Sequence, residues 1–206
     1  MPHTDPNDRE TAMIADPTHQ LSIALDATEQ LIAAIADDQW TAPTPCAEWQ
    51  VRDLVDHVVI GNQMFASILR GQPPAPRRPV PLPDADQLTA YRASATAVLE
   101  AFRQPGVLEQ IFTVPMGTVP GMVALHLRIT ELLVHGWDLA RATGQPTNFS
   151  PELAEQELAF TQATLPQVPA ARSPFAPPQP VADSAPAIDR LAALLGRNVT
   201  KSAPPR

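Results

Sequence analysis

The sequence predicts an all-α protein, a four-helix bundle followed by a short C-terminal extension that is helical and proline-rich. Apolar residues recur at spacings of three and four in several long segments, which is the pattern of amphipathic helices. The 25 prolines cluster between those segments, where helices stop. A length of 206 residues suits one domain with a single hydrophobic core.

Six segments have a helical pattern, and the four longest are expected to form the bundle in up-down order. Thr18 is placed to cap the first segment, and Ser150 the fifth, with Pro151 in its first turn. Pro120 lies in the first turn of the fourth segment, and Gly144 ends it. The expected helices cover residues 18–35, 50–69, 84–103, 120–144, 151–165 and 187–195.

Three regions of different composition follow from this reading. Residues 1–17 are polar and form an N-terminal arm, residues 18–166 form the bundle with one additional helix, and residues 167–206 form the proline-rich extension with a short helix. Residues 71–83 carry several prolines and indicate an extended surface connector. Residues 110–119 are β-branched and aromatic, which favours a strand-like loop.

The charge and the single cysteine restrict the class of protein. Fourteen Lys and Arg against 22 Asp and Glu give a net charge of -8, which disfavours nucleic acid as a partner. Cys46 alone cannot form an internal disulfide and is compatible with a reducing compartment. No secretory signal and no membrane-spanning apolar run occur, so a cytoplasmic, soluble protein without a membrane partner is expected.

Glu131 and His135 stand four residues apart in the fourth predicted helix, so they share one face of it. His57, in the second predicted helix, is the best third candidate for a divalent metal site, most often zinc. Spacing alone leaves a simpler alternative open. In it, Glu131 forms an ordinary hydrogen bond or ion pair with His135, and His57 is a histidine of the core. His126 points about 140° away from Glu131 and is excluded from the site.

Three nearby residues allow two interpretations each. Asp138 could orient the His135 ring, but a pairing with Arg141 or a cap to a neighbouring loop is favoured. Arg128 is interpreted as a solvated flank rather than as a contact for an anionic substrate. Cys46 is interpreted as a small structural residue in preference to a redox centre or nucleophile.

Two blocks together resemble a known family. Residues 44–57, TPCAEWQVRDLVDH, and residues 131–144, ELLVHGWDLARATG, are similar to the metal-binding domain of mycothiol-dependent maleylpyruvate isomerase, within the DinB-like superfamily of four-helix bundles. The resemblance implies a divalent metal held by His57, Glu131 and His135, at which the thiol mycothiol loses its proton and becomes a nucleophile. It covers about residues 20–197.

The sequence departs from that family in two places. Residues 151–206 do not form the additional α/β domain that supplies an arginine to the isomerase, so the maleylpyruvate reaction itself is not expected. Gln50 replaces the usual small polar cap of the second helix, which weakens the helix start by up to about 1 kcal/mol.

The sequence therefore favours a metal-dependent thiol transferase or isomerase-like enzyme that acts on a small electrophile. A non-catalytic metal-binding bundle, used in sensing or assembly, is the alternative. A third hypothesis, hydrolysis by metal-bound water, needs a general base other than Glu131. The expected partners are a small thiol and a small electrophilic substrate, and a homodimer is kept open.

Overall fold

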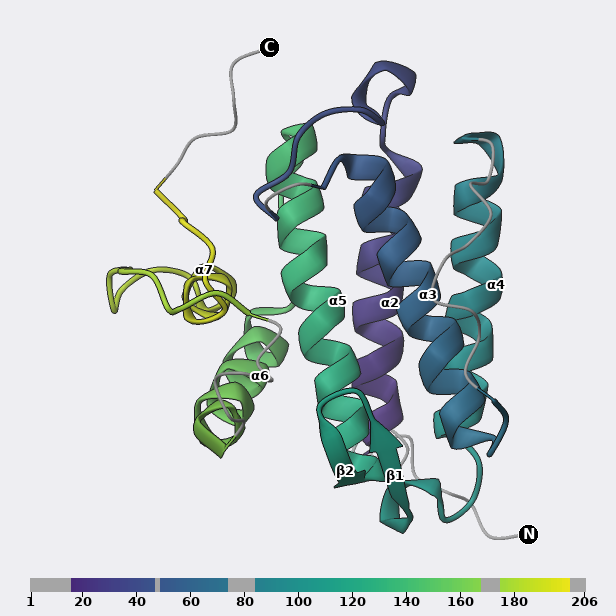
Figure 1. Cartoon of the computed structure of the whole chain (residues 1–206). Coiled ribbons are helices and arrows are strands. Elements are labelled where there is room, and N and C mark those ends of the chain that lie inside the picture. The colour runs from purple at the N-terminus through teal and green to yellow at the C-terminus, as the bar shows by residue number, and fades with distance from the viewer. Residues whose placement is uncertain (1–15, 47–48, 74–83, 168–174, 201–206) are drawn as a thin grey trace, which may run out of the picture.

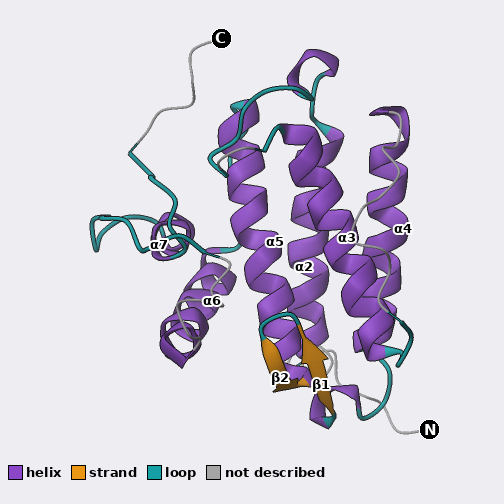
Figure 2. Ribbon diagram, viewed as in Figure 1, coloured by secondary structure: helices purple, strands orange, loops and turns teal. Residues whose placement is uncertain are grey.

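The structure, a computed structural model, describes residues 16–46, 49–73, 84–167 and 175–200. Its bundle consists of α2 (Pro17–Ala33), α3 (Val51–Leu69), α4 (Asp84–Phe102) and α5 (Gly121–Thr143), which lie side by side (Figure 1). Two further helices, α6 (Pro151–Thr164) and α7 (Ala187–Leu194), lie beside α5 (Figure 2). The predicted all-α bundle with a helical C-terminal extension is confirmed.

The helices do not run in the predicted up-down order. Contacts between α3 and α4 advance in the same direction along both helices, from Asp56 with Gln87 to Asn62 with Ser94, so these two helices are parallel. α3 and α5 are antiparallel, since His57 meets His135 whereas Gly61 meets Arg128. The prediction was wrong because the spacing of apolar residues does not show in which direction the chain enters α4.

The length of the chain between these helices permits the parallel arrangement. Residues 70–83 can reach about 46 Å when extended, whereas a 19-residue helix such as α3 is about 28 Å long. The chain can therefore return along the bundle before α4 begins, as in bundles with a long crossover connection.

Most predicted helix ends agree with the structure to within two residues. Ser150 caps α6 by accepting a hydrogen bond from the Leu153 amide, and Gly144 ends α5 in the left-handed conformation. The predicted cap at Thr18 was wrong, because Asp16 caps α2 and accepts hydrogen bonds from the Thr18 amide and hydroxyl. Proline favours the first turn, which places the cap before Pro17.

Gln50 stands at the start of α3 without a side-chain capping hydrogen bond. The carboxylate of Asp53 instead accepts a hydrogen bond from the Gln50 amide at 3.0 Å. The acidic residue in the first turn thus satisfies one donor of this helix end.

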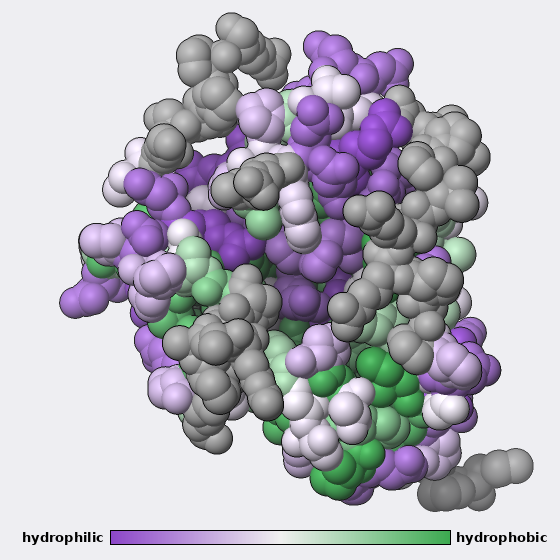
Figure 3. All heavy atoms as spheres, viewed as in Figure 1, coloured by the Kyte–Doolittle hydropathy of each residue, from purple (hydrophilic) through white to green (hydrophobic). Residues whose placement is uncertain are grey.

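The strand-like stretch is a β-hairpin. β1 (Ile111–Val114) pairs antiparallel with β2 (Gly117–Pro120), with Ile111 opposite Pro120 and Val114 opposite Gly117. The hairpin lies at the end of the bundle where α5 begins, and hydrophobic surface gathers there in the space-filling view (Figure 3). Ile111, the first residue of β1, is 63% exposed.

Burial is most complete along α5, because the bundle covers one side and α6 and α7 cover the other. This double cover explains why polar residues of α5 such as Arg128, His135 and Asp138 are buried. Among the described residues, no helix has the length and apolar character needed to cross a membrane.

Parts of three predictions lie outside the described residues. The N-terminal arm, residues 1–17, is described only at Asp16 and Pro17, which begin α2. Residues 74–83 of the expected connector and 168–174 and 201–206 of the extension are also outside.

Candidate active site

The structure brings His57 of α3 and His135 of α5 together across the antiparallel pair of helices. Their ring centres are 4.9 Å apart, and the rings are nearly perpendicular, at 79°. Trp49, in the loop before α3, packs against both imidazoles, with centroid distances of 4.6 Å to His57 and 6.0 Å to His135. The sequence did not single out Trp49, whose role depends on the loop that places it there.

His57 is neutral at physiological pH. Burial, followed by the nearby imidazole of His135, lowers the pKa of His57 to about 4, although the Glu131 carboxylate acts in the opposite direction. A neutral imidazole retains a lone pair on one ring nitrogen, which is the form that binds metals.

A carboxylate orients the second imidazole from behind. The Nδ1 atom of His135 lies 3.2 Å from Oδ2 of Asp138, which is fully buried on the same helix. An Nδ1–H that donates to a carboxylate leaves Nε2 as the acceptor nitrogen, an arrangement common to metal-binding histidines. Asp138 therefore orients His135, and the favoured pairing with Arg141 was wrong, because Arg141 faces Asp189 at 3.7 Å.

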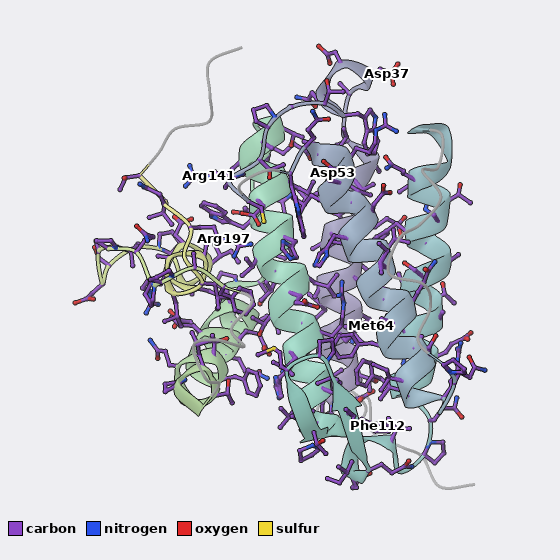
Figure 4. The ribbon with its side chains drawn as sticks, in the orientation of Figure 1. Asp37, Asp53, Met64, Phe112, Arg141 and Arg197 are labelled. Carbon is purple, nitrogen blue, oxygen red and sulfur yellow. The ribbon has the colours of Figure 1, made fainter. Side chains whose placement is uncertain are left out.

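Arg197 completes this arrangement from the C-terminal segment. Its Nη2 donates to Asp138 Oδ2 at 2.8 Å, and its Nη1 donates to the Leu195 carbonyl at 2.9 Å. In Figure 4, Arg197 lies on the side of α5 that faces α7. Arg197, Asp138 and His135 thus form a continuous series of contacts.

Glu131 is held by Arg128, one turn earlier on α5. Arg128 Nη1 donates to Glu131 Oε2 at 2.8 Å, and Nη2 donates to the Val58 carbonyl at 3.3 Å. The interpretation of Arg128 as a solvated flank was wrong, since its side chain is 0% exposed. α3 covers it at Gly61, where a Cβ atom would collide with the guanidinium.

The fit of these residues to a metal ion is mixed. Two imidazoles that share a tetrahedral zinc ion, with Zn–N distances of about 2.0 Å, have ring centres about 5 Å apart, as His57 and His135 do. Two histidines and a glutamate are also a donor set that zinc favours. Within the described part of the chain, however, no three His, Cys, Asp or Glu residues surround one point. Oε2 of Glu131 instead accepts a hydrogen bond from Arg128.

A cavity of about 370 Å³ opens beside His57 and Glu131. α3, the β-hairpin, α5 and α6 form its walls, together with Phe175. Glu131 is the one carboxylate in the described walls, so the second acid or base that hydrolysis requires is not found there. The cavity is large enough for a small organic molecule.

Cys46 lies near the same arrangement. Its Sγ atom is 4.0 Å from Nη2 of Arg197, and burial, followed by the charge of Asp138, raises the pKa of its thiol. A raised pKa keeps the sulfur protonated and poorly nucleophilic. This agrees with the structural role preferred for Cys46, which remains a prediction.

His126 belongs to a different cluster, as its position on the helix indicated. Its Nδ1 atom lies 2.7 Å from Glu157 of α6, and its ring stacks on Phe160 at 4.7 Å. Thr130 also donates to the buried Glu157 carboxylate at 2.9 Å. These contacts attach α6 to α5.

The fold and the site define a class, a helical bundle with two imidazoles and a carboxylate beside a largely apolar cavity. Residues 21–140 match the family described as the mycothiol maleylpyruvate isomerase N-terminal domain, and the chain belongs to that family. Two relatives from strains of Mycobacterium tuberculosis, "Uncharacterized protein MT0763" and "Uncharacterized protein Rv0738", are each 41% identical over 185 residues. The alignment covers 89% of this chain and 99% of each relative.

Two crystal structures of the mycothiol-dependent maleylpyruvate isomerase have a similar fold. A histidine-to-alanine mutant has a TM-score of 0.57 at 14% identity, covering 70% of this chain and 68% of that one. The other structure has a TM-score of 0.56 at 15% identity, with the same coverage. At such identities the similarity shows the fold alone.

Proposed function

We propose that this protein is a divalent-metal-dependent enzyme that transfers or adds a small thiol, with mycothiol as its thiol, to a small electrophile. His57, Glu131 and His135 would hold the metal, with zinc the expected ion. The observation that carries the proposal is the approach of His57 to His135 at 4.9 Å, with Asp138 behind His135. Mycothiol is suggested by the family and by the isomerase of similar fold.

Each protein group has a distinct task. His57 presents a neutral nitrogen because burial prevents its protonation. Asp138 fixes the ring of His135, and Arg197 fixes Asp138. Arg128 restrains Glu131 through Oε2, so Glu131 has to turn or use its other oxygen to join the two imidazoles. A divalent metal, when bound, would deprotonate a coordinated thiol at neutral pH.

The cavity favours an enzyme over a metal site used only in sensing or assembly. Structural zinc sites are closed by four protein ligands, whereas catalytic sites keep one position open. Three ligands beside a cavity of about 370 Å³ leave room for both a thiol and an acceptor. The hydrolytic alternative lacks support from the described walls, because Glu131 already belongs to the proposed ligand set.

Metal analysis of the purified protein tests the ligand set. The wild-type chain should carry about one divalent ion, and His57→Ala, Glu131→Ala and His135→Ala should lose it. His126→Gln is the matched control, since it changes another α5 histidine and keeps a hydrogen-bonding group for Glu157. Unchanged metal content in all three alanine variants would show that these residues do not form the metal site.

Thiol binding tests the activity separately. Cobalt(II)-substituted protein should develop a sulfur-to-cobalt charge-transfer band when mycothiol is added, and calorimetry should show saturable binding. A metal-loaded protein with neither signal would leave a metal-binding bundle without thiol chemistry. In that case the assembly or sensing function would take its place.

A further inference from the structure

The cavity beside the proposed metal site has largely apolar walls. They are contributed by α3, the hairpin, α5, α6 and the segment after α6, and include Met64, Phe65, Met116, Leu127, Phe160 and Phe175. Figure 4 places Met64 on the stretch of α3 that approaches the hairpin. Such walls favour an apolar ligand, because removal of its surface from water is the main source of affinity.

The charges around the cavity disfavour an anion. Its described walls include two titratable residues, His57 and Glu131, and no lysine or arginine. The buried cation Arg128 is not part of the described wall and already bonds Glu131 and the Val58 carbonyl. A carboxylate or sulfonate entering the cavity would lose its hydration beside Glu131 without gaining a cationic partner from the described walls.

One polar atom in the wall lacks a partner. Thr161 on α6 is only 4% exposed, and its buried hydroxyl has no hydrogen-bond partner. The other two threonine hydroxyls of the wall are engaged, because Thr130 donates to Glu157 and Thr164 donates to the Phe160 carbonyl. A buried hydroxyl without a partner is costly, and a ligand can supply the partner.

From these three observations we propose that the cavity binds an uncharged, largely apolar molecule with one hydrogen-bonding group for Thr161, and that it rejects dicarboxylates. Its reactive end would face His57 and Glu131, and this part alone relies on the proposed function. The substrate would thus differ in charge from the dianion maleylpyruvate, which the isomerase of similar fold is named for.

Two dyes with one skeleton test the charge preference. N-phenyl-1-naphthylamine is neutral and has a single N–H group, whereas 8-anilinonaphthalene-1-sulfonate carries an additional anionic group. Fluorescence titration of the full chain should show saturable binding of the neutral dye, with binding of the sulfonate at least about tenfold weaker. Equal affinities, tighter binding of the sulfonate, or no binding of the neutral dye would overturn the proposal.

Charge variants at Met64 show whether the dyes report on this cavity. Met64→Lys should bring the affinity for the sulfonate to that of the neutral dye or above it, whereas Met64→Glu should weaken the sulfonate further. Both variants add a charge of similar reach at a half-buried position, and circular dichroism checks that each is folded. An identical ratio of the two affinities in both variants would overturn the charge argument.

Thr161→Val tests the polar contact. It should weaken the neutral dye about fivefold while leaving the discrimination against the sulfonate intact. Unchanged affinity for the neutral dye would place its N–H group elsewhere and overturn the assignment to Thr161. All titrations are repeated with a chelator present, so an absence of metal, which would defeat the proposed function, does not affect the outcome.

Discussion

Arg197 donates a 2.8 Å hydrogen bond to Asp138, a residue 59 positions earlier in the chain. Asp138 is 0% exposed and Arg197 8% exposed, so the two charges are removed from water together. Because Asp138 also holds His135, the C-terminal segment takes part in the geometry of the site. The C-terminal segment thus supplies a guanidinium group, and this group binds a carboxylate of the protein itself, that of Asp138.

Arg197→Met should lower the free energy of unfolding by about 3–5 kcal/mol, because it leaves the Asp138 carboxylate buried without a cation. Urea denaturation measures the change. A second variant, Asp138→Asn combined with Arg197→Met, should recover part of the loss, since the uncompensated charge is then absent.

Arg92→Met is the matched control for this experiment. Arg92 pairs with Glu29 at the same distance, 2.8 Å, but its side chain is 56% exposed. Exposed ion pairs contribute about 0–1 kcal/mol, so this variant should unfold almost as the wild type does. Equal losses in the two variants would contradict a special role for the buried pair.

Cys46 should react slowly with iodoacetamide at pH 7.5. Burial and Asp138 raise the pKa of its thiol above 9.0, so the thiolate fraction stays small and the rate should still be rising above pH 9. The Arg197 guanidinium acts in the opposite direction, so Arg197→Met should slow the reaction further. Rapid modification at pH 7.5, measured by mass spectrometry, would instead indicate an activated thiol.

Gly61→Ala should destabilise the protein although alanine is the better helix former. Alanine gains about 1 kcal/mol in a helix interior. At this position its Cβ would collide with the Arg128 guanidinium, which is fully buried and cannot move aside easily. Overpacking costs typically about 1–3 kcal/mol, so the net change should be a loss of stability.

A double mutant isolates the cause of that loss. In an Arg128→Met background the collision is relieved, so Gly61→Ala should become neutral or stabilising. Equal effects of Gly61→Ala in both backgrounds would show that Arg128 is not responsible. Thermal denaturation of the four proteins gives the comparison.

Thr161→Val should raise the free energy of unfolding by about 1 kcal/mol, because it removes a buried hydroxyl without a partner and keeps the shape of the side chain. Thr130→Val is the opposite case, since it removes a hydroxyl that donates to the buried Glu157 carboxylate. That variant should lose about 1–3 kcal/mol. Stability changes of the same sign in the two variants would contradict this assignment of hydrogen bonds.

The sequence predicted the helices well because their signals are local. The positions of proline and glycine predicted that α6 starts after Ser150 and that α5 ends at Gly144. The cap at Asp16 was missed because Pro17 was not treated as the first helical residue. The parallel direction of α3 and α4 depends on where the chain between them runs, which spacing does not reveal.

The site was predicted only in part for the same reason. The pairing of His57 with His135 was expected from residue types and the family resemblance, and the structure brings the two rings together. Trp49 and Arg197 were missed because each reaches the site through a tertiary contact. Arg128 was misjudged because periodicity alone does not show that α6 and α7 cover α5 on its second side.

The hydrogen bond from Arg197 also sets an order of events during synthesis. At about 5–20 residues per second, a ribosome reaches residue 197 about 3–12 s after residue 138. During that interval all four helices of the bundle have been synthesised, while Asp138 still lacks its guanidinium partner. The final settling of α5, and with it the orientation of His135, therefore has to wait until residue 197 has been synthesised.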